Sequence, residues 1–447
     1  MKQADVVIVG GSAAGPVAGV TVKRHYKDLS VLLIRKEREA RVMVPCGIPY
    51  IFGTIGSADK NVIPDALLAN NGIELMIDEV TDIDRQSNTL KTAGGETVSY
   101  KKLILAVGSL PIRIPIPGME RENVFTVRKD ADYLAEIQSK ISQAKDIVVI
   151  GGGFIGVEMA DECFKKDSPN VTIVEILPHC LMLVLDPEFY HKAEEKLKER
   201  GIRLLTNDRV TEILGDGKAN AVALGSGNKL KADVVIFGIG AAPNTELAQK
   251  IGLKLGEMKG IEVDEYQRTS DENIFAIGDC ADKKSFFTGK PSNVRLASIA
   301  TNEARIAGAN VKELKRKNPG AIGVFATALG DFAVAAAGLT EKAAYKEGYD
   351  IIVTEVAAPD KHPGCMPNAC EQKVKLVFDG KSKKLLGGQV YGGASTAELA
   401  NVIAMAIQNG MTADDVAMFQ MGTHPALTAS PIAYQLVNAA EMALAKM

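Results

Sequence analysis

The chain has 447 residues, of which 46% are hydrophobic and 24% charged, and its formal net charge is −3. That length predicts two to four domains, and the composition excludes a disordered chain, a collagen-like rod and a small disulfide-stapled protein. The slightly negative charge argues against a nucleic-acid binder and against a binder of anionic membranes, since both are normally basic.

The sequence gives no sign of a secretory signal or a membrane span. Residues 1–11 pass directly into a β-branched run and a glycine turn, without the basic region, longer apolar stretch and cleavage site of a signal peptide. Nowhere do 18 apolar residues follow one another. The cysteines are scattered, at positions 46, 163, 180, 280, 365 and 370. We expect a soluble cytoplasmic protein with reduced thiols, in which cysteine chemistry is catalytic rather than structural.

Short apolar runs that end near glycine recur along the chain and predict strands of parallel sheets. The runs are Asp5–Val9, Leu103–Ala106, Ile147–Ile150, Val234–Phe237 and Ile274–Ile277. Helical patterns follow the first and third. The plan strand–glycine turn–helix–strand over residues 6–34 returns over residues 147–175, which predicts two α/β nucleotide-binding domains of one design. Pro111–Gly118, with three prolines in eight residues, reads as a connector between them.

After about residue 320 the pattern changes to alternating runs typical of antiparallel strands. Two helices are expected after these strands, and no glycine fingerprint occurs, so this part predicts a third, α+β domain with a different role. The expected strands are Phe332–Ala337, Ile351–Val356, Lys373–Phe378 and Leu385–Val390, and the expected helices are Thr396–Asn409 and Pro431–Lys446.

The second repeat carries a full G-x-G-x-x-G fingerprint over residues 151–156. Gly151 permits the tight turn, Gly153 lets the backbone approach a pyrophosphate, and Gly156 allows close packing of helix on strand. The phosphates would lie at the helix N-terminus, where free N–H groups favour anions. Glu175 ends the next strand, where an acid accepts from a ribose 2′-OH and repels a 2′-phosphate. The pattern predicts NADH rather than NADPH, against the alternative of a tight turn with a surface glutamate.

The first repeat is less regular. Gly10, Gly11 and Gly15 are present, but Ser12 occupies the second fingerprint glycine, and the following strand ends in Arg35 without the usual acid. Two later segments support a nucleotide site in this domain. One is the small-residue turn Ala106–Ser109 after a strand, and the other is the strand ending Gly278-Asp279.

These motifs, in this order, resemble the FAD-dependent pyridine nucleotide-disulfide oxidoreductases that have two dinucleotide-binding domains. The resemblance covers essentially the whole chain. It implies an FAD domain over 1–112 and 246–320, an NADH domain over 113–245, and a C-terminal α+β dimerisation domain over 321–447, in a homodimer whose active site is completed across the interface.

The resemblance also implies roles for individual residues. FAD would be bound by Gly10, Gly11, Gly15, Ala106, Gly108, Gly278 and Asp279, and NADH by Gly151, Gly153, Phe154, Gly156 and Glu175. Asp279 would bind the ribityl chain and Phe154 would be the aromatic gate over the flavin. The alternatives are a helix N-cap for Asp279 and a core aromatic for Phe154. Glu37 is a candidate for the acid missing at Arg35.

A lone cysteine, Cys46, stands in Val44–Tyr50. Disulfide reductases of this family need a C-x-x-x-x-C pair here, but Ile51 holds the second position. Cys46 followed by Gly-Ile-Pro-Tyr therefore resembles the single-cysteine branch of coenzyme A-disulfide reductases, persulfide or polysulfide reductases, and NADH oxidases. One thiol suffices when substrate supplies the other sulfur. A helix starting after Cys46 would lower the pKa of its thiol; the alternative is a buried, inert cysteine.

Three hypotheses for the electron acceptor follow. Oxidases of the branch carry a histidine in the first glycine loop, where this chain has Ala13, so a small disulfide, persulfide or polysulfide is favoured. Coenzyme A disulfide is less well supported, because Cys365-Met366 replace a tyrosine pair and Thr21 replaces an arginine. An NADH oxidase acting on oxygen is the second hypothesis. An electron-transfer flavoprotein serving a protein such as rubredoxin is the third, against which Cys46 argues.

Cys365 and Cys370 form a C-x-x-x-x-C pair that, by resemblance, lies at the dimer interface. They are either a second redox pair or sulfane-sulfur site, or two ordinary loop thiols. His424, in a His-Pro segment, is either a general acid/base toward the partner's thiol or a surface histidine. Glu158, on the helix after the second fingerprint, either lies near the nicotinamide or, in the interpretation we favour, is a glutamate on a helix surface. His25, His179 and His191 are isolated in the sequence, and no ligand spacing predicts a metal.

Overall fold

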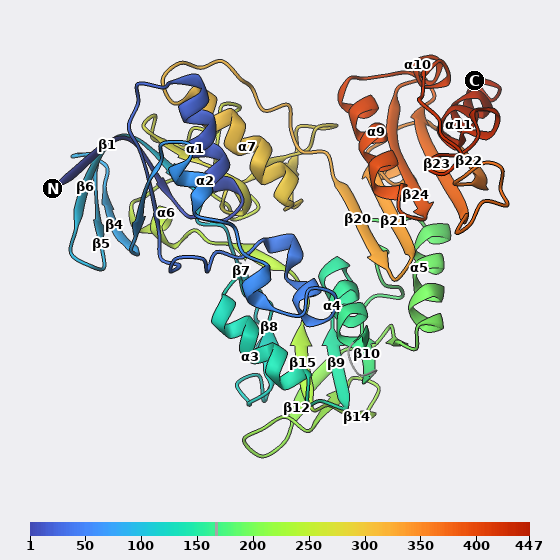
Figure 1. Ribbon diagram of the computed structural model, residues 1–447, viewed down its shortest axis with the longest axis horizontal. Helices are drawn as coiled ribbons and strands as arrows, with labels where there is room; N and C mark the ends of the chain where they lie inside the picture. Colours follow the sequence, from blue (N-terminus) through green and yellow to red (C-terminus); the bar gives the residue numbers. More distant parts are fainter. Residues whose placement is uncertain (166–168) are drawn as a thin grey trace. The chain divides into compact units, whose positions relative to one another are not determined.

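The computed structural model describes residues 1–165 and 169–447 and divides into two compact units (Figure 1). Unit 1 consists of Met1–Pro115, Phe125–Ala144 and Ile239–Ala321. Unit 2 consists of Ile116–Val124, Lys145–Gly238 and Ile322–Met447. None of the helices in these described ranges is both long and apolar enough to cross a bilayer.

Unit 1 is built on a sheet with the strand order β3-β2-β1-β6-β5-β4, to which β17 adds beside β6. The pairs β1–β2, β1–β6, β2–β3 and β6–β17 are parallel, and β4–β5 and β5–β6 are antiparallel. The strands are β1 (Lys2–Val9), β2 (Val31–Arg35), β3 (Glu74–Ile77), β4 (Val80–Asp84), β5 (Thr89–Thr92), β6 (Thr97–Leu105) and β17 (Ile274–Ala276).

Two-sided burial explains why β1 reads as one unbroken apolar run. Val6 and Ile8 pack in a cluster with residues of the long helices α1 (Ala14–His25) and α7 (Ala297–Asn310), whereas Val7 and Val9 face a second cluster on the other side of the sheet. A strand covered on both faces has no polar side to show in its sequence. The expected parallel strands are therefore confirmed, with ends shifted by a few residues.

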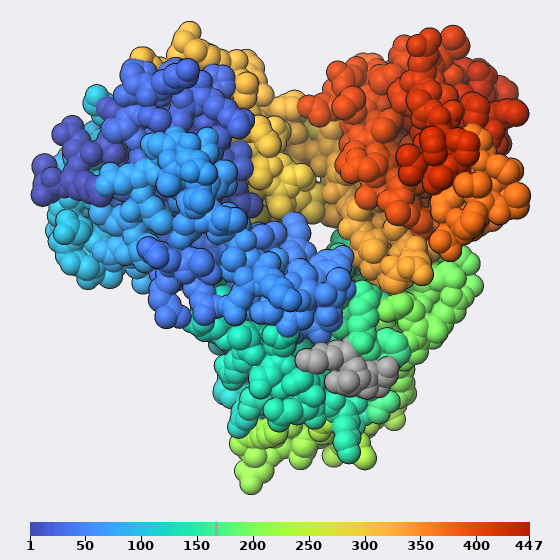
Figure 2. Space-filling model, in the orientation of Figure 1, coloured from blue at the N-terminus to red at the C-terminus, as the bar shows by residue number. Residues whose placement is uncertain are grey.

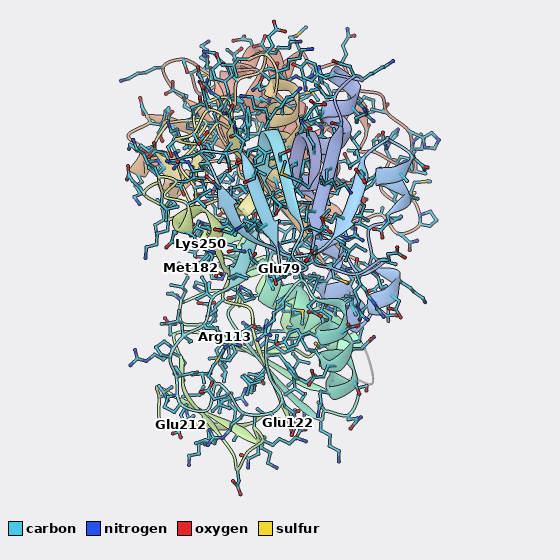
Figure 3. The ribbon with its side chains drawn as sticks, turned by 90° about the vertical axis from the view of Figure 1, so that its left-hand side faces the viewer. Glu79, Arg113, Glu122, Met182, Glu212 and Lys250 are labelled. Carbon is cyan, nitrogen blue, oxygen red and sulfur yellow. The ribbon has the colours of Figure 1, made fainter. Side chains whose placement is uncertain are left out.

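Apart from the 11-residue helix α3, the remaining elements of unit 1 are short. They are η1 (Pro45–Gly47), η2 (Pro49–Phe52), η3 (Ala58–Lys60), α2 (Ala66–Ala69), β7 (Ser109–Pro111), α3 (Ala131–Ile141), β16 (Ala241–Pro243), α6 (Glu246–Lys250), η4 (Gly278–Cys280), β18 (Lys283–Lys284) and β19 (Pro291–Ser292). Strands β7 and β16 pair with each other, as do β18 and β19. Figure 3 labels Lys250 at the end of α6, where its ammonium donates to the carbonyl of Thr81 at 2.9 Å.

The first part of unit 2 repeats the nucleotide-binding plan. Its parallel core has the order β11-β10-β9-β15, with β8 (Val124–Thr126) at the edge and a separate sheet β12-β13-β14. Figure 3 labels Glu122 and Glu212, the latter on β12. The elements are β9 (Asp146–Ile150), α4 (Phe154–Lys165), β10 (Asn170–Val174), α5 (Pro187–Glu199), β11 (Arg203–Leu205), β12 (Val210–Leu214), β13 (Ala221–Leu224), β14 (Lys229–Lys231) and β15 (Val234–Phe237).

The C-terminal part of unit 2 is an antiparallel sheet of order β20-β21-β24-β23-β22 with helices beside it, and it forms one packed body in orange and red in Figure 2. All four expected strands and the helix Thr396–Asn409 are confirmed, with small shifts of their ends. The expected helix Pro431–Lys446 is α-helical only over Gln435–Leu444, after a short 3₁₀ turn. Strand β20 is an edge strand that the pattern did not predict. The elements are β20 (Val324–Leu329), β21 (Phe332–Gly338), α8 (Glu341–Lys346), β22 (Ile351–Pro359), β23 (Glu371–Asp379), β24 (Leu385–Gly392), α9 (Thr396–Gln408), α10 (Ala413–Ala417), η5 (Pro431–Ala433) and α11 (Gln435–Leu444).

A buried ion network joins the two parts of unit 2. The ammonium of Lys375, on β23, lies 2.8 Å from Glu341, 3.2 Å from Asp186 and in contact with Glu188 at the start of α5. Gln389 donates to the Asp186 carboxylate at 2.5 Å. Because removing one partner from a buried ion pair leaves an uncompensated charge, at a cost of about 3–5 kcal/mol, this network fixes α5 against the antiparallel sheet.

Candidate active site

The first glycine turn packs too closely to admit side chains at Gly10 and Gly15. Gly10 has a φ of +118°, and a Cβ there would lie 2.2 Å from the carbonyl oxygen of Ala106. A Cβ on Gly15 would lie 1.9 Å from the carbonyl oxygen of Gly10. Three predicted residues are thus brought together at the start of α1. The hydroxyl of Ser12 in the same turn is buried and has no hydrogen-bond partner among the described residues, which suits a phosphate oxygen as its partner.

Arg35, which stands where the usual ribose-binding acid is missing, has a structural partner of its own. Its guanidinium forms a two-pronged pair with Asp65, with Nη1–Oδ1 at 2.6 Å and Nη2–Oδ2 at 2.8 Å, and its Nε donates to the carbonyl oxygen of Glu37 at 3.0 Å. The Arg35 stem lies directly under Gly11, where a Cβ would come 2.5 Å from Cδ. Arg35 therefore supports the glycine turn from below. Asp65 lies 30 residues away, and no local pattern marks it.

Asp279 lies in a polar cluster within unit 1. Ser109 donates to its Oδ2 at 2.8 Å, and the ammonium of Lys129 lies 3.4 Å from the same oxygen. Burial alone would raise the pKa of this carboxyl, but Lys129 and Ser109 outweigh it, and the pKa is lowered. Asp279 stands within η4 and its side chain caps no helix, so the N-cap alternative is wrong. An ionised acceptor held in this way suits the hydroxyls of a ribityl chain.

A buried ion pair is hydrogen-bonded to the backbone of the turn before Asp279. Glu303 on α7 accepts the N–H of Gly278 at 2.8 Å, and the ammonium of Lys283 donates to the Gly278 carbonyl at 2.6 Å. Lys283 and Glu303 are 3.0 Å apart. Burial raises the pKa of Glu303 to about 7, against the opposing effect of Lys283. No sequence pattern predicts this pair. Its one signal was a lone glutamate among the alanines of α7's buried face.

Cys46 is exposed, at the centre of the 3₁₀ turn Pro45–Gly47. An α-helix directly after Cys46, the condition for a helix dipole at the thiol, is not formed: Pro45 and Pro49 divide the segment into two short 3₁₀ turns, because proline starts such turns but cannot donate within them. Asn61 holds the turn, with its side chain donating to the Val44 carbonyl at 3.0 Å. A Cβ on Gly47 would lie 2.0 Å from Oδ1 of Asn61, so this position requires glycine.

The second fingerprint has the same construction in unit 2. Gly151 has a φ of +106°, and a Cβ on Gly156 would lie 1.8 Å from the Gly151 carbonyl oxygen. At Gly153, by contrast, a Cβ would meet no described atom within 4 Å. The turn is therefore closed on its inner side and open at Gly153, the geometry that a dinucleotide pyrophosphate requires.

Glu175 lies at the end of β10 and is buried. Its carboxylate accepts the N–H of Gly152, within the fingerprint, and the N–H of Leu177 at 2.7 Å. Both oxygens are thus oriented by the backbone beside the glycine turn. This arrangement suits an acceptor for a ribose hydroxyl.

The first turns of α4 pack against the edge strand β20. The ring of Phe154 stacks on Phe325, with centroids 5.3 Å apart and planes at 11°. Glu158, one turn later, accepts a hydrogen bond from the hydroxyl of Thr327 at 3.0 Å, and burial raises its pKa to about 7. The interpretation of Glu158 as a surface glutamate is therefore wrong, because β20, which the sequence pattern did not predict, covers this face of α4.

The predicted cysteine pair lies in the loop between β22 and β23 and forms no disulfide. Cys365 is exposed, whereas Cys370 is partly buried. The N–H of Cys370 donates to Asp360 at 2.9 Å, and burial together with this carboxylate raises the pKa of the Cys370 thiol to about 11. Cys370 is therefore a protonated thiol at neutral pH.

The same loop is bonded to the His424 segment. The Nδ1 of His362 lies 3.0 Å from the carbonyl oxygen of Thr428. The backbone N–H of His362 donates to the carbonyl oxygen of Pro425 at 3.0 Å. His424 is exposed, and its Nδ1 accepts the N–H of Ala426 at 3.2 Å, which leaves Nε2 to carry a proton. The structure thus brings the cysteine-pair loop and His424 together in unit 2, while Cys46 belongs to unit 1.

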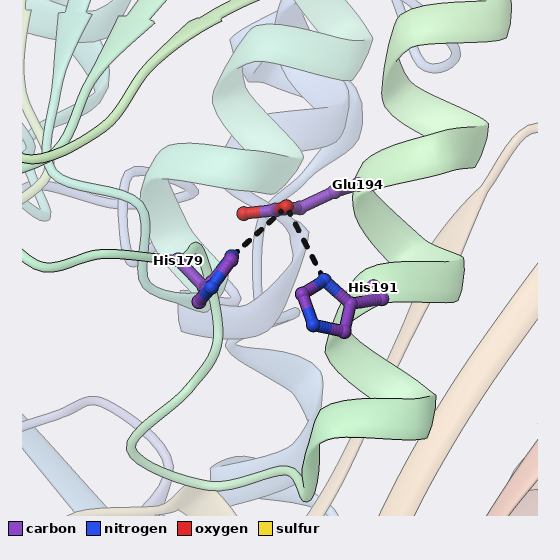
Figure 4. Close-up of side chains that lie close together, drawn as sticks. All are labelled: His179, His191 and Glu194. Carbon is purple, nitrogen blue, oxygen red and sulfur yellow. Dashed lines mark hydrogen bonds and ion pairs between the residues drawn. The ribbon is translucent and has the colours of Figure 1, made fainter.

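The interpretation of His179 and His191 as isolated is also wrong. The two histidines lie against Glu194, one from the loop after β10 and the other from α5 (Figure 4). The two histidines are 12 residues apart in the sequence, across a loop and the start of a helix, so no local pattern marks them as neighbours.

Both glycine turns therefore fit dinucleotides, and the similarity of the chain to known protein families supports this. Residues 4–304 match the family model described as pyridine nucleotide-disulphide oxidoreductase, and residues 324–432 match the model for that family's dimerisation domain. The chain belongs to the pyridine nucleotide-disulphide oxidoreductase family. It is an oxidoreductase of mixed α/β fold with a dinucleotide-binding region and a C-terminal dimerisation domain, and the resemblance seen in the sequence is confirmed.

Individual relatives extend over nearly the whole chain. The NAD(P)H coenzyme A polysulfide/persulfide reductase of Pyrococcus horikoshii is 33% identical over 92% of this chain and 92% of its own. The NADH oxidase of Methanocaldococcus jannaschii is 30% identical over 99% of each chain. The solved structure of an NAD-dependent persulfide reductase from A. fulgidus has a TM-score of 0.91 and 32% identity, covering 99% of this chain and 83% of that one. Membership of this family implies the use of FAD and a reduced pyridine nucleotide.

Proposed function

We propose that this protein is an NADH-dependent FAD enzyme that reduces a small persulfide, polysulfide or disulfide through Cys46. The observation that carries the proposal is the exposed Cys46 on the proline–glycine turn of unit 1, with the buried, apolar Ile51 where a two-cysteine reductase would need its second thiol. A single accessible thiol is suited to a substrate that contributes the other sulfur.

The cofactor turns support the choice of NADH and the position of FAD. In unit 2, the buried carboxylate of Glu175 beside the fingerprint would repel a 2′-phosphate and accept from a 2′-hydroxyl. In unit 1, Gly10, Gly15 and the unpartnered hydroxyl of Ser12 would hold the FAD pyrophosphate, and Asp279 the ribityl chain. When bound, FAD supplies the two-electron chemistry that links hydride transfer from NADH to reduction of sulfur.

The chemistry at Cys46 is thiol–disulfide exchange. The thiolate attacks the sulfane sulfur of a persulfide RSSH, so that an S–S bond to Cys46 forms, the substrate S–S bond breaks and RSH leaves. Two electrons from NADH then reduce the sulfur on Cys46, which departs as hydrogen sulfide and regenerates the thiol. The net reaction, RSSH + NADH + H⁺ giving RSH + H₂S + NAD⁺, is balanced. The turn held by Asn61 keeps the thiol accessible to the substrate.

Oxygen is the second candidate acceptor, because the M. jannaschii relative, which is aligned over 99% of this chain, is an NADH oxidase. Against it stands Ala13, which offers no proton donor in the first glycine turn. The relative from P. horikoshii and the A. fulgidus structure support a sulfur acceptor.

We also propose a homodimer in which the loop with Cys365 and Cys370 and the His424 segment meet Cys46 of the partner subunit. Large apolar side chains in and beside the matched dimerisation region support an interface there: Leu427 is 68% and Ile432 87% exposed. His424 would deliver a proton to a departing thiolate through Nε2. Co-expressed Cys46→Ser and His424→Ala chains should regain activity in the mixed dimer, which has one intact site; no recovery would contradict the shared site.

The central experiment is anaerobic NADH oxidation with glutathione persulfide, polysulfide, coenzyme A disulfide and, separately, oxygen. We expect turnover with at least one sulfur acceptor, and a loss of at least a hundredfold in Cys46→Ser. Cys163→Ala is the matched control, because burial raises the pKa of that thiol and keeps it inert.

The outcomes separate the candidates. Sulfur turnover in Cys46→Ser at the unmutated rate would refute the role of Cys46. Rapid oxidation of NADH by oxygen, with no sulfur acceptor used, would favour the oxidase instead. A Cys365→Ser, Cys370→Ser double variant with unchanged turnover on every acceptor would remove the second cysteine pair from the reaction.

A further inference from the structure

We propose that His179, His191 and Glu194 form a site for a divalent transition-metal ion of the zinc class. The Nδ1 of His179 lies 3.3 Å and the Nδ1 of His191 4.0 Å from the same carboxylate oxygen of Glu194 (Figure 4). The candidate ligand atoms all lie within 4.8 Å of one another, and within residues 1–165 and 169–447 this is the group of three such side chains that meets that criterion.

The donor set selects the metal. Two imidazole nitrogens and one carboxylate oxygen match the His₂Glu set of open zinc sites, in which water takes the fourth position. Calcium and magnesium prefer oxygen ligands throughout, so they are disfavoured here. Ligands around a tetrahedral zinc lie about 3.3–3.5 Å apart. The separation at His179 already has this length, and the Nδ1 of the exposed His191 lies 4.0 Å from the same oxygen.

The surroundings hold the ligands in place before a metal binds. Glu194 is buried, and its second oxygen accepts the N–H of Cys180 at 2.9 Å, which orients the carboxylate. The ring of Tyr190 stacks on His179 with centroids 4.7 Å apart, and the two histidine rings meet edge to face at 4.5 Å. An outer hydrogen bond on a ligating carboxylate is a support that metal sites usually have.

The site would tie helix α5 to the loop that follows β10. His179 is in that loop, whereas His191 and Glu194 are on α5, at positions i and i+3 on one face of the helix. Two residues beyond His179, the N–H of Leu181 donates to the carbonyl of Gly152, in the second glycine fingerprint, at 2.9 Å. A bound metal would therefore brace the loop that rests on the glycine turn of unit 2.

The test is equilibrium binding of Zn²⁺ to tag-free, chelator-treated holoenzyme. The parent chain should carry Cys46→Ser, Cys365→Ser and Cys370→Ser, so that accessible thiols do not bind the probe. We expect one Zn²⁺ per chain and a rise in Tm on its addition. His191→Ala should weaken binding at least about tenfold, since loss of even an outer partner costs 10–100-fold, and should abolish the rise in Tm.

Controls separate metal ligation from damage to the fold. His191 is exposed, so His191→Ala should keep the metal-free Tm of the parent. His25→Ala removes a histidine from unit 1 and should leave the affinity unchanged. Glu194→Gln, which keeps the acceptor for Cys180, should also weaken binding. The proposal is overturned if the parent binds no Zn²⁺ at micromolar concentration, or if His191→Ala binds it as tightly as the parent.

Discussion

Glu158→Gln should stabilise the protein at alkaline pH and have no effect in acid. Burial raises the pKa of the Glu158 carboxyl from its ordinary 4.5 to about 7. Below pH 4.5 the group is neutral in both the folded and the unfolded chain. Between pH 4.5 and 7 the unfolded chain loses this proton while the folded chain keeps it, so the free energy of unfolding falls as pH rises. At about 1.36 kcal/mol per pKa unit, the full penalty above pH 7 is about 3 kcal/mol.

The assay is the difference in Tm between Glu158→Gln and the unmutated holoenzyme, measured from pH 5 to pH 8 with excess FAD. The difference should be small at pH 5, grow through pH 6 and level off above pH 7, because glutamine keeps the hydrogen bond to Thr327 without the charge. Glu136→Gln, at an exposed position on α3, is the control and should give a flat difference. A Glu158→Gln difference that does not vary with pH, or a variant less stable than the parent at pH 8, would refute the reasoning.

Three further predictions concern the cofactor and thiol turns. Gly47→Ala places a Cβ 2.0 Å from Oδ1 of Asn61, so it should abolish most sulfur turnover while flavin absorbance shows that FAD is retained; full activity would contradict the packing of this turn. Lys129→Met removes the cation beside Asp279 and should weaken FAD binding by about tenfold in a dissociation titration, with Lys129→Arg restoring it. Glu175→Ala should reduce the ratio of kcat/KM for NADH over NADPH by at least about tenfold, and an unchanged ratio would exclude this carboxylate from nucleotide selection.

The sequence predicted what local patterns encode. Strands such as β1, buried on both faces, appear as continuous apolar runs, and glycines such as Gly10 mark turns whose backbone admits no side chain. Cys46 could be singled out because the position of a missing second cysteine can be read directly from the spacing.

Tertiary partners could not be predicted in this way. Asp65 lies 30 residues from Arg35 and Lys129 lies 150 residues from Asp279, so only folding brings each charge to its partner. The same holds for Thr327, which changes Glu158 from a surface residue into a carboxyl of raised pKa.

Two local features had other physical causes. No α-helix follows Cys46 directly, because Pro45 and Pro49 divide residues 45–52 into separate 3₁₀ turns. The strand β20 was not predicted because its burial alternates while its sequence does not: Thr327 and Leu329 are buried and the two alanines beside them are exposed, so no polar–apolar alternation marks the strand.

The most direct test of the role of Cys46 separates the two halves of the reaction by rapid mixing under anaerobic conditions. In Cys46→Ser, NADH should bleach the flavin absorbance at the unmutated rate, because the nucleotide sites are intact. The return of that absorbance on mixing with glutathione persulfide should be at least a hundredfold slower than in the unmutated enzyme, because no thiol remains to receive the sulfur. A return at the unmutated rate would contradict the assignment of Cys46 as the sulfur-reducing thiol.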